Sequence, residues 1–423
     1  MSNCKCDNLR TRLKGNYTSV NDTVSAVAEK AMEAYCQGTF SVGGMMLDSE
    51  GNLLNTMHNN VVMNNKTNVP TAHGERQLVD WYYDQIAKGV PMPPPNEITI
   101  VTSLDPCCMC SGSILTSGFK VVSASFDTFS GINYNTQADF PSLDPKLRPI
   151  AQETFSYPEV VGTTCFARPA SSAAVPAFFT QQTIAQNAQA LCTSVFNATL
   201  TQVQNTVNND LPPEQLLNPQ SLAGNDPIIE KLKSVYRDAL TYVAPARGKP
   251  DFGLASHLIR ALLIDYDQGG DGNAVAFLDY FGNLLLCLPG NQTASAIQTA
   301  FMSTTRSYAK LRYELREDPD VGERALKYLC HPKYGTFVFA RGPNSSSKSL
   351  IDFGAYGSTM EEKLPAVNPL SFQYVVASMT QADLTQYCQG LPPLYSEAIG
   401  VYPTQVKDQL LIDEVMSFLP ENK

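Results

Sequence analysis

The stretch S-L-D-P-C-C-M-C at residues 103–110 decides how the N-terminal part of this chain folds. The apolar run I-T-I-V-T before it predicts a strand, and S-G-S-I-L after it predicts a helix. Pro106 suits the first turn of that helix, because proline fixes φ and has no N–H to leave unpaired. Cys107 and Cys110 then stand at positions i and i+3, where two side chains point the same way and can share one metal ion. The positive end of the helix lowers a thiol pKa and so favours the thiolate that metals bind.

The elements on either side of this stretch alternate between helix and strand. Apolar spacing and glycine stops predict a helix at 22–37, a hairpin from 39 to 58 around S-E-G, a helix from 71 and a strand at 120–126. With the strand and helix around the cysteines, this order predicts a three-layer α/β domain.

Composition describes an ordinary globular protein. The chain has 423 residues, enough for two to three domains, with 43% hydrophobic and 17% charged residues. Its net charge is −10, and the first 160 residues hold 16 acidic against 11 basic side chains, which disfavours binding to nucleic acid. No apolar stretch approaches the roughly 18 residues that span a bilayer, and the N-terminus lacks an apolar signal region. We therefore expect no membrane association.

The 11 cysteines are odd in number and scattered, which favours a reducing, cytoplasmic compartment. We expect the following to be packed and unpaired: Cys36, Cys165, Cys192, Cys287 and Cys388. Cys4 and Cys6 form a C-x-C that could bind metal, but no histidine or second cysteine pair follows nearby.

An internal repeat indicates a duplicated domain. L-D-S-E-G-N-L-L at 47–54 recurs as L-D-Y-F-G-N-L-L at 278–285, with six of eight positions identical. Helix-like S-H-L-I-R-A-L-L-I-D precedes the second copy, and two further apolar runs, G-T-F-V-F-A-R-G-P and S-L-I-D-F-G-A-Y, read as strands. Convergence on one good hairpin is the alternative.

These features divide the chain into four expected parts. They are a catalytic domain at 1–160, a helical linker or insertion at 161–250, a second domain at 251–365 and a C-terminal helical segment at 366–423. Residues 169–224 contain no Lys or Arg, and their apolar rhythm predicts uncharged helices ending at L-P-P, 211–213. A flexible linker is the alternative for that segment.

Chemistry concentrates in two motifs about 30 residues apart. His73 and Glu75 form H-G-E at a helix start, and Cys107 and Cys110 follow. A catalytic zinc site takes three protein ligands and keeps one open position, and His73 with the two cysteines supplies three. Zinc lowers the pKa of a bound water to roughly 7, and Glu75 is then the acid/base that moves its proton. A purely structural zinc would need a fourth protein ligand, which the sequence does not offer.

H-G-E followed by P-C-C-M-C resembles the H-x-E…P-C-x-x-C signature of the zinc-dependent cytidine deaminase superfamily. T-A-H-G-E and S-L-D-P-C-C-M-C-S-G-S-I are most similar to its guanine deaminase and tRNA adenosine deaminase branch. The resemblance covers residues 22–135 and implies a cytidine-deaminase-like fold. It also implies one Zn²⁺ per chain on His73, Cys107 and Cys110, with Glu75 as general acid/base.

The resemblance also implies substrate contacts. An Asn after the second strand holds the substrate in relatives; Asn59 and Asn60 both lie there, and we prefer Asn60. Phe126 and Asp127, after the last strand, stand where relatives shape the substrate pocket. Cys108 falls at a variable position and is expected to be a buried neighbour rather than a ligand, and Gly74 replaces the usual Ala.

The second copy lacks the motifs, because T-A-H-G-E aligns with Thr299-Ala300-Phe301-Met302-Ser303 and no P-C-x-x-C follows. It therefore resembles inactive repeats of the superfamily, and we expect a monomeric pseudo-dimer or a homodimer. The expected function is hydrolytic deamination of a small free aminopurine or aminopyrimidine, as base, nucleoside or related heterocycle. The alternatives are deamination of a base in tRNA or single-stranded nucleic acid, and a non-catalytic zinc-containing scaffold subunit.

Overall fold

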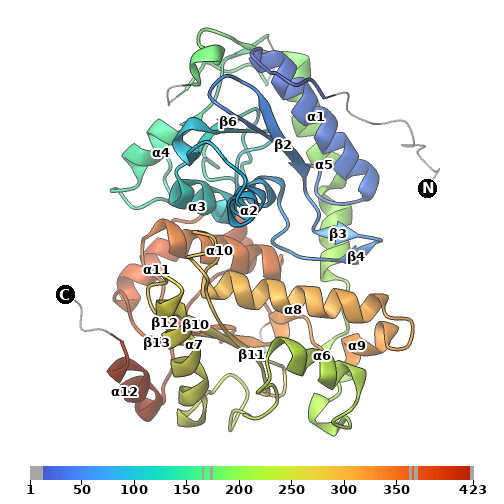
Figure 1. The fold of residues 1–423 in the computed structure, drawn as a ribbon, viewed down its shortest axis with the longest axis vertical. Coiled ribbons are helices and arrows are strands. Elements are labelled where there is room, and N and C mark those ends of the chain that lie inside the picture. Colours follow the sequence, from blue (N-terminus) through green and yellow to red (C-terminus); the bar gives the residue numbers. More distant parts are fainter. Residues whose placement is uncertain (1–12, 164–165, 172–174, 362–363, 366–369, 420–423) are drawn as a thin grey trace. The chain divides into compact units, whose positions relative to one another are not determined.

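The computed structural model describes residues 13–163, 166–171, 175–361, 364–365 and 370–419, which form two compact units (Figure 1). Unit 1 comprises the described residues up to Val207, together with 345–354 and 390–394. Unit 2 comprises 208–344, the described part of 355–389, and the described residues from Tyr395 on. The expected boundary at residue 160 lies inside unit 1, so 161–250 is not a separate region between two domains.

Unit 1 is built on a five-stranded sheet of order β2-β1-β5-β6-β7. Strand β1 is antiparallel to β2 and β5, whereas β5, β6 and β7 run parallel. The strands are β1 (Gly43–Leu47), β2 (Leu53–His58), β5 (Thr99–Thr102), β6 (Lys120–Ser123) and β7 (Phe155–Ser156). The helices are α1 (Val20–Gln37), α2 (Gly74–Ala87), α3 (Cys108–Ser117), α4 (Arg148–Thr154) and α5 (Gln186–Asn208). Two small pairs join β3 (Val62–Met63) to β4 (Lys66–Thr67) and β8 (Val160–Val161) to β9 (Ile184–Ala185).

Two adjacent glycines of β1 show the three layers of unit 1. A Cβ on Gly43 would lie 2.5 Å from the carbonyl oxygen of Val27, in helix α1. A Cβ on Gly44 would lie 3.1 Å from Cδ1 of Leu78, in helix α2. Because successive side chains of a strand point to opposite faces, α1 covers one face of the sheet and α2 the other. The expected three-layer α/β architecture is confirmed.

The uncharged segment forms helix α5 rather than a flexible linker. Ala188 and Cys192, from its first turns, lie in the core of unit 1 with Val24 and Val27 of α1. Val203, further along α5, packs in a second cluster around Phe40. Burial of these apolar positions holds the helix in place without charged side chains.

Unit 2 repeats the sheet of unit 1 in the order β11-β10-β12-β13-β14. Strand β10 is antiparallel to β11 and β12, and β12, β13 and β14 run parallel. The strands are β10 (Ala274–Leu278), β11 (Leu284–Pro289), β12 (Thr336–Arg341), β13 (Phe372–Val376) and β14 (Thr404–Gln405). The helices are α6 (Pro227–Val235), α7 (Ala255–Asp267), α8 (Ala300–Glu317), α9 (Ala325–Tyr328), α10 (Ser347–Met360), α11 (Gln381–Gln389) and α12 (Gln409–Ser417), with the first part of α10 assigned to unit 1.

The repeated octapeptide forms the same hairpin in both units. Oδ1 of Asp48 accepts backbone N–H bonds from Glu50 and Asn52, and Asp279 makes the matching pair of bonds with Phe281 and Asn283. The turn glycines have φ of 80° and 85°, a left-handed conformation that costs glycine least. The register shifts at the same place in each hairpin, beside the strand-ending leucine. The two octapeptides therefore share a turn conformation and a hydrogen-bond pattern as well as six identical residues.

Two expectations for the C-terminal part are wrong. S-L-I-D-F-G-A-Y, 349–356, lies in helix α10 and is not a strand. A short apolar run that is buried on most sides carries no clear period, so helix and strand cannot be separated. Residues 366–423 are not only helical, because β13 and β14 come from them and pair with β12 and with each other. The second sheet therefore extends beyond the expected end at 365.

One cysteine expectation is also wrong, because Cys36 is disulfide-bonded. Pairing depends on tertiary proximity, which cysteine spacing in a long chain does not reveal. Cys192, Cys287 and Cys388 are buried and unpaired, as expected. Cys4, Cys6 and Cys165 lie outside the described residues. Within the part of the chain that the structure describes, every helix is too short or too polar to cross a membrane.

Candidate metal and catalytic site

Two helix starts bring the candidate site together in unit 1. His73 is the N-cap of α2 and Glu75 lies in its first turn. Cys107 is the N-cap of α3, and Cys110 lies one turn further on. Pro106 therefore precedes the N-cap of α3. The expectation that this proline lies in the first turn of the helix is wrong. A Cβ on Gly74 would lie 3.6 Å from its nearest neighbours, which is ordinary contact, so the alanine usual in relatives would also fit.

The three expected zinc ligands converge. Ligand atoms of His73, Cys107 and Cys110 all lie within 4.8 Å of one another. Nδ1 of His73 is 3.4 Å from Sγ of Cys107, and both cysteines are buried. Among the described residues this is the one such grouping of His, Cys, Asp and Glu, and it lies in unit 1. One nitrogen and two sulfurs suit zinc and leave a fourth tetrahedral position free for a small molecule.

Glu75 stands against this cluster. Its Oε2 lies 3.5 Å from Sγ of Cys110, and its Oε1 accepts a 2.6 Å hydrogen bond from the hydroxyl of Thr102. The side chain is 3% exposed. Burial raises the pKa of Glu75 above its ordinary value, although the Thr102 hydroxyl lowers it. A buried carboxyl with a raised pKa can both take up and release a proton, which is what an acid/base requires.

The cysteine pair fits a metal ion electrostatically. A hydrogen bond from Cys110 lowers the pKa of Cys107 well below its usual value, and His73 adds to this. Burial and the neighbouring Cys107 raise the pKa of Cys110. One thiolate therefore forms readily and the second is suppressed by the first. A divalent cation bound by both sulfurs would replace the remaining proton, as metal binding to thiols generally does.

The two candidate asparagines have different surroundings. Asn60 donates to the carbonyl of His58 and to Gln77, and its Oδ1 accepts from Gln37, so its amide is committed on both sides. Asn59 is buried, and its Oδ1 accepts from the Thr39 hydroxyl at 2.7 Å and from a backbone N–H. Within the described residues the Nδ2 of Asn59 forms no hydrogen bond.

Asp127 and Phe126 shape the loop after β6. Oδ1 of Asp127 accepts the backbone N–H groups of Phe129 and Ser130, so its carboxylate holds the turn that follows. Phe126 stacks on Tyr157, with ring centroids 4.6 Å apart. The guanidinium of Arg168 lies 5.0 Å from the Phe126 centroid. Neither residue belongs to the group of metal ligands.

Sequence reasoning missed Thr102, Asp105 and Tyr157. Thr102 ends the strand that leads to the cysteines, and Asp105 immediately precedes Pro106, so their positions in the motif were available signals. Burial raises the pKa of Asp105 to about 8, although hydrogen bonds from Tyr157 and from the Asn133 backbone lower it. Tyr157 lies more than forty positions downstream of the cysteines, and no local signal links it to them.

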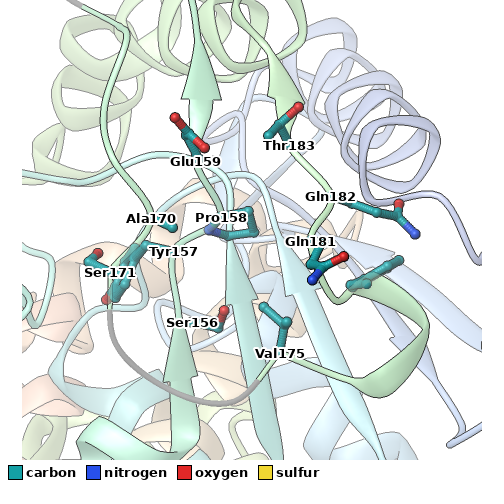
Figure 2. A pocket seen from close by; sticks show the side chains of 11 residues that line it. Ser156, Tyr157, Pro158, Glu159, Ala170, Ser171, Val175, Gln181, Gln182 and Thr183 are labelled. Atoms are coloured by element: carbon teal, nitrogen blue, oxygen red, sulfur yellow. The ribbon is translucent and has the colours of Figure 1, made fainter.

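A pocket of about 210 Å³ lies beside β7, β8 and β9 (Figure 2). Tyr157, Glu159, Ser171 and Gln182 are among the residues that line it. None of the expected metal, catalytic or substrate residues does, so this pocket is not the expected substrate site.

Comparison with known proteins agrees with this geometry. Residues 18–125 match the family model described as the cytidine and deoxycytidylate deaminase zinc-binding region. The matched range contains the three candidate ligands, Glu75 and Thr102. This part of the chain is therefore similar to the zinc-binding region of that deaminase family, and His73, Cys107 and Cys110 are positioned to bind a metal ion.

The individual proteins that this chain resembles share low sequence identity with it. A cytosine deaminase of Candida albicans is 30% identical over 94 residues, which is 22% of this chain and 57% of that protein. The chain thus matches little more than half of that relative's length. A guanine deaminase of Nitrosomonas europaea is 13% identical, covering 44% of this chain and 90% of that one, with a TM-score of 0.26. A structure from work on tRNA:A34 deaminases is 16% identical, covering 26% and 80%, with a TM-score of 0.22. No conclusion rests on scores this low.

Proposed function

We propose that this protein is a zinc-dependent hydrolase that deaminates a small free aminopurine or aminopyrimidine, as base, nucleoside or related heterocycle, and releases ammonia. The observation that carries the proposal is the convergence of His73, Cys107 and Cys110 beside the buried carboxyl of Glu75. Three protein ligands with an adjacent acid/base are the arrangement of a catalytic zinc site. The family match at residues 18–125 supports the same class of reaction.

In the proposed reaction, water adds to the ring carbon that bears the exocyclic amine, the C–N bond breaks, and ammonia leaves. Zinc bound by the three ligands supplies Lewis-acid activation of the water. Glu75 takes a proton from the water and delivers it to nitrogen, so its Oε2 must be free when the substrate enters. Thr102 holds Oε1 and so orients the carboxyl toward the ligands.

Asn59 is our proposed substrate contact in place of Asn60. Its Oδ1 is fixed by Thr39, whereas its Nδ2 can donate to an acceptor atom of a heterocycle. The side chain is thus preoriented at the end of β2. Asn60 would have to break contacts with Gln37 and Gln77 to do the same. Phe126 and Asp127 act indirectly in this proposal, by shaping the loop beside the cysteine turn.

The substrate is proposed to be free rather than part of a nucleic acid because of charge. The first 160 residues hold five more acidic than basic side chains, 16 against 11, and a polyanion would be repelled on average. If free compounds give no ammonia while a tRNA or single-stranded DNA does, this part of the proposal is wrong and the zinc chemistry stands.

We also propose that unit 2 is a duplicate that has lost the site. By helix starts, Thr299, the N-cap of α8, corresponds to His73, which displaces the sequence alignment by two residues and still provides no metal ligand. The proposal requires one zinc per chain. Two zinc ions per chain in the purified protein would contradict it.

The test is ammonia release from a panel of free bases, nucleosides and nucleotides. Glu75→Gln should lower the rate by about 10²–10⁴-fold, because it removes the acid/base, while zinc content stays unchanged. Glu153→Gln, an exposed carboxyl in the same unit, is the matched control and should leave the rate unchanged. Full activity of Glu75→Gln would contradict the proposed mechanism. Zinc-loaded protein that is silent until a second chain is added would favour the scaffold alternative.

A further inference from the structure

The turn that carries Cys107 is held by a buried carboxyl group. Asp105, two residues earlier, is 3% exposed. Its Oδ1 accepts a hydrogen bond from the hydroxyl of Tyr157, and its Oδ2 accepts one from the backbone N–H of Asn133 at 2.8 Å. Both partners lie far along the chain from the turn, so the Asp105 carboxyl group connects segments that are distant in the sequence.

The three residues close a ring of hydrogen bonds. Nδ2 of Asn133 donates to the phenolic oxygen of Tyr157, while the Asn133 backbone donates to Asp105. Oδ1 of Asn133 accepts the backbone N–H of Phe140 at 2.9 Å. Asn133 and Tyr157 are fully buried. Losing one member of such a ring leaves buried polar atoms unpaired, which costs more than the bond itself contributes.

Next to the ring, the loop after β6 lies directly on the cysteine turn. The N–H of Ile132 donates to the carbonyl of Pro106 at 3.0 Å, and Gly131 pairs with Cys107 as an antiparallel bridge. A Cβ on Gly131 would lie 2.6 Å from Oδ2 of Asp105, so only glycine allows this approach. Three consecutive loop residues thus contact three consecutive residues of the turn.

Tyr157 also contacts the start of that loop. Its ring stacks on Phe126, and the guanidinium of Arg168 lies 5.7 Å from its centroid. In Figure 2 Tyr157 lies in the wall of the pocket beside β7, with no metal-ligand residue among the pocket's lining. One side chain therefore contacts the loop near its beginning, at Phe126, and again further along, at Asn133.

We propose that Tyr157 is a positioning residue of the zinc site. Through Asp105 it fixes the turn that places Cys107, and through Phe126 and Asn133 it fixes the loop that lies on this turn. The proposal rests on the assignment of zinc to His73, Cys107 and Cys110. Residues that orient metal ligands without touching the metal typically contribute 10–100-fold in metal affinity.

The first experiment measures zinc affinity by competition with a chromogenic chelator of known affinity. Tyr157→Phe should bind zinc about 10-fold or more weakly than wild type. Tyr82→Phe is the control: this ring is also buried in unit 1, and the variant loses one phenolic hydrogen bond, 3.0 Å to the carbonyl of Pro93, whereas Tyr157→Phe loses the bonds to Asp105 and from Asn133. Thermal unfolding of both metal-free variants gives the purely structural cost. Equal zinc affinity in the two variants would overturn the proposal.

The second experiment asks whether Tyr157 acts through Asp105. Asp105→Asn alone should weaken zinc binding, and adding Tyr157→Phe to it should change the affinity less than twofold. Additive losses would show that Tyr157 acts by another route and would overturn the proposal. If Tyr157→Phe does not fold, the zinc affinity of Asp105→Asn is compared with that of wild type. Undiminished zinc affinity in Asp105→Asn would also overturn the proposal.

These readouts are independent of the reaction. Wild-type protein that binds no zinc would contradict the metal site itself. Wild-type protein that binds zinc but releases no ammonia would contradict the proposed substrate and leave the affinity comparison intact. Cobalt substitution adds a spectroscopic check, since the thiolate-to-metal absorption of Tyr157→Phe should shift relative to Tyr82→Phe if the position of Cys107 changes.

Discussion

The hydroxyl of Thr102 lies 2.6 Å from Oε1 of Glu75 and 3.0 Å from the carbonyl oxygen of Leu104. It has one proton to donate, so it can serve either acceptor. When Glu75 is ionised, its charged carboxylate is the stronger acceptor, so the Thr102 hydroxyl donates its hydrogen bond to Glu75. Thr102 thus restrains the orientation of the Glu75 carboxyl group, which we propose transfers protons.

Removing this hydroxyl should impair catalysis while sparing the metal. Thr102→Val keeps the shape of the side chain and should lower kcat about 10-fold, because Glu75 loses the donor that orients it and that stabilises its charged form. Thr102→Ser retains the hydroxyl and should stay within about threefold of wild type. Steady-state kinetics with zinc content measured in parallel decides. A fully active valine variant would show that Glu75 is oriented by other contacts.

Substitution of Cys110 should cause loss of zinc, whereas substitution of its neighbour Cys108 should not. Both cysteines are buried and neither forms a disulfide, but only Cys110 belongs to the ligand cluster. Cys110→Ser should lose most of its zinc, whereas Cys108→Ser should keep one zinc per chain. Free zinc at about 100 times its Kd should stabilise wild type and Cys108→Ser by about 2.7 kcal/mol. Unfolding with and without a chelator measures this, and a chelator-insensitive wild type would argue against the site.

In unit 2, Asp210 pairs with Arg312, and both side chains are nearly buried. Asp210→Asn should lower the free energy of unfolding by about 3 kcal/mol, because it leaves the guanidinium buried without its counter-ion. Glu314→Gln, on the same helix but in a half-exposed pair with Lys231, is the control and should cost at most about 1 kcal/mol. Denaturant unfolding at pH 7 makes the comparison.

The same pair predicts a pH dependence. Burial raises the pKa of Asp210, but Arg312 and His331 lower it more strongly, so the net pKa lies below the ordinary value. A depressed folded-state pKa gives stability that is present above the unfolded pKa of about 3.9 and lost as the pH falls through the folded value. The difference in unfolding free energy between wild type and Asp210→Asn should therefore shrink as the pH falls below about 4. A difference that stays constant or grows below about pH 4 would refute this account.

Gly43 should be the least replaceable glycine of β1. An alanine there would place Cβ 2.5 Å from the carbonyl oxygen of Val27 and 2.7 Å from the backbone N of Ala31. Both contacts are backbone atoms of α1, so the helix must move as a whole, at a cost of about 1–3 kcal/mol. Gly15→Ala, with nothing within 4 Å of its Cβ, is the control and should be neutral. Thermal unfolding of the two variants compares them, and equal melting temperatures would show that α1 moves freely over the sheet.

The sequence predicted the group of candidate metal ligands because these residues are local to two helix starts. His73 and Glu75 lie within one turn of each other, and Cys107 and Cys110 are one turn apart, so spacing alone fixes each pair. The hairpin was predictable for the same reason, since Asp48, Gly51 and Asn52 form its turn with one another. Where prediction failed, as at 349–356, burial on most sides had removed the period that separates helix from strand.

By itself the sequence determined the local chemistry: the two motifs, the helices and strands that present them, and the repeated hairpin. Only the tertiary structure decided which distant residues contact the turn that carries the cysteines. Tyr157 and Asn133 reach Asp105 because parallel strands bring their carboxyl ends to one edge of the sheet. That Cys36 is disulfide-bonded was likewise not predicted from cysteine spacing. Hydrogen bonds between remote segments depend on distances in the folded chain, whereas a sequence period or a residue spacing records only distances along the chain.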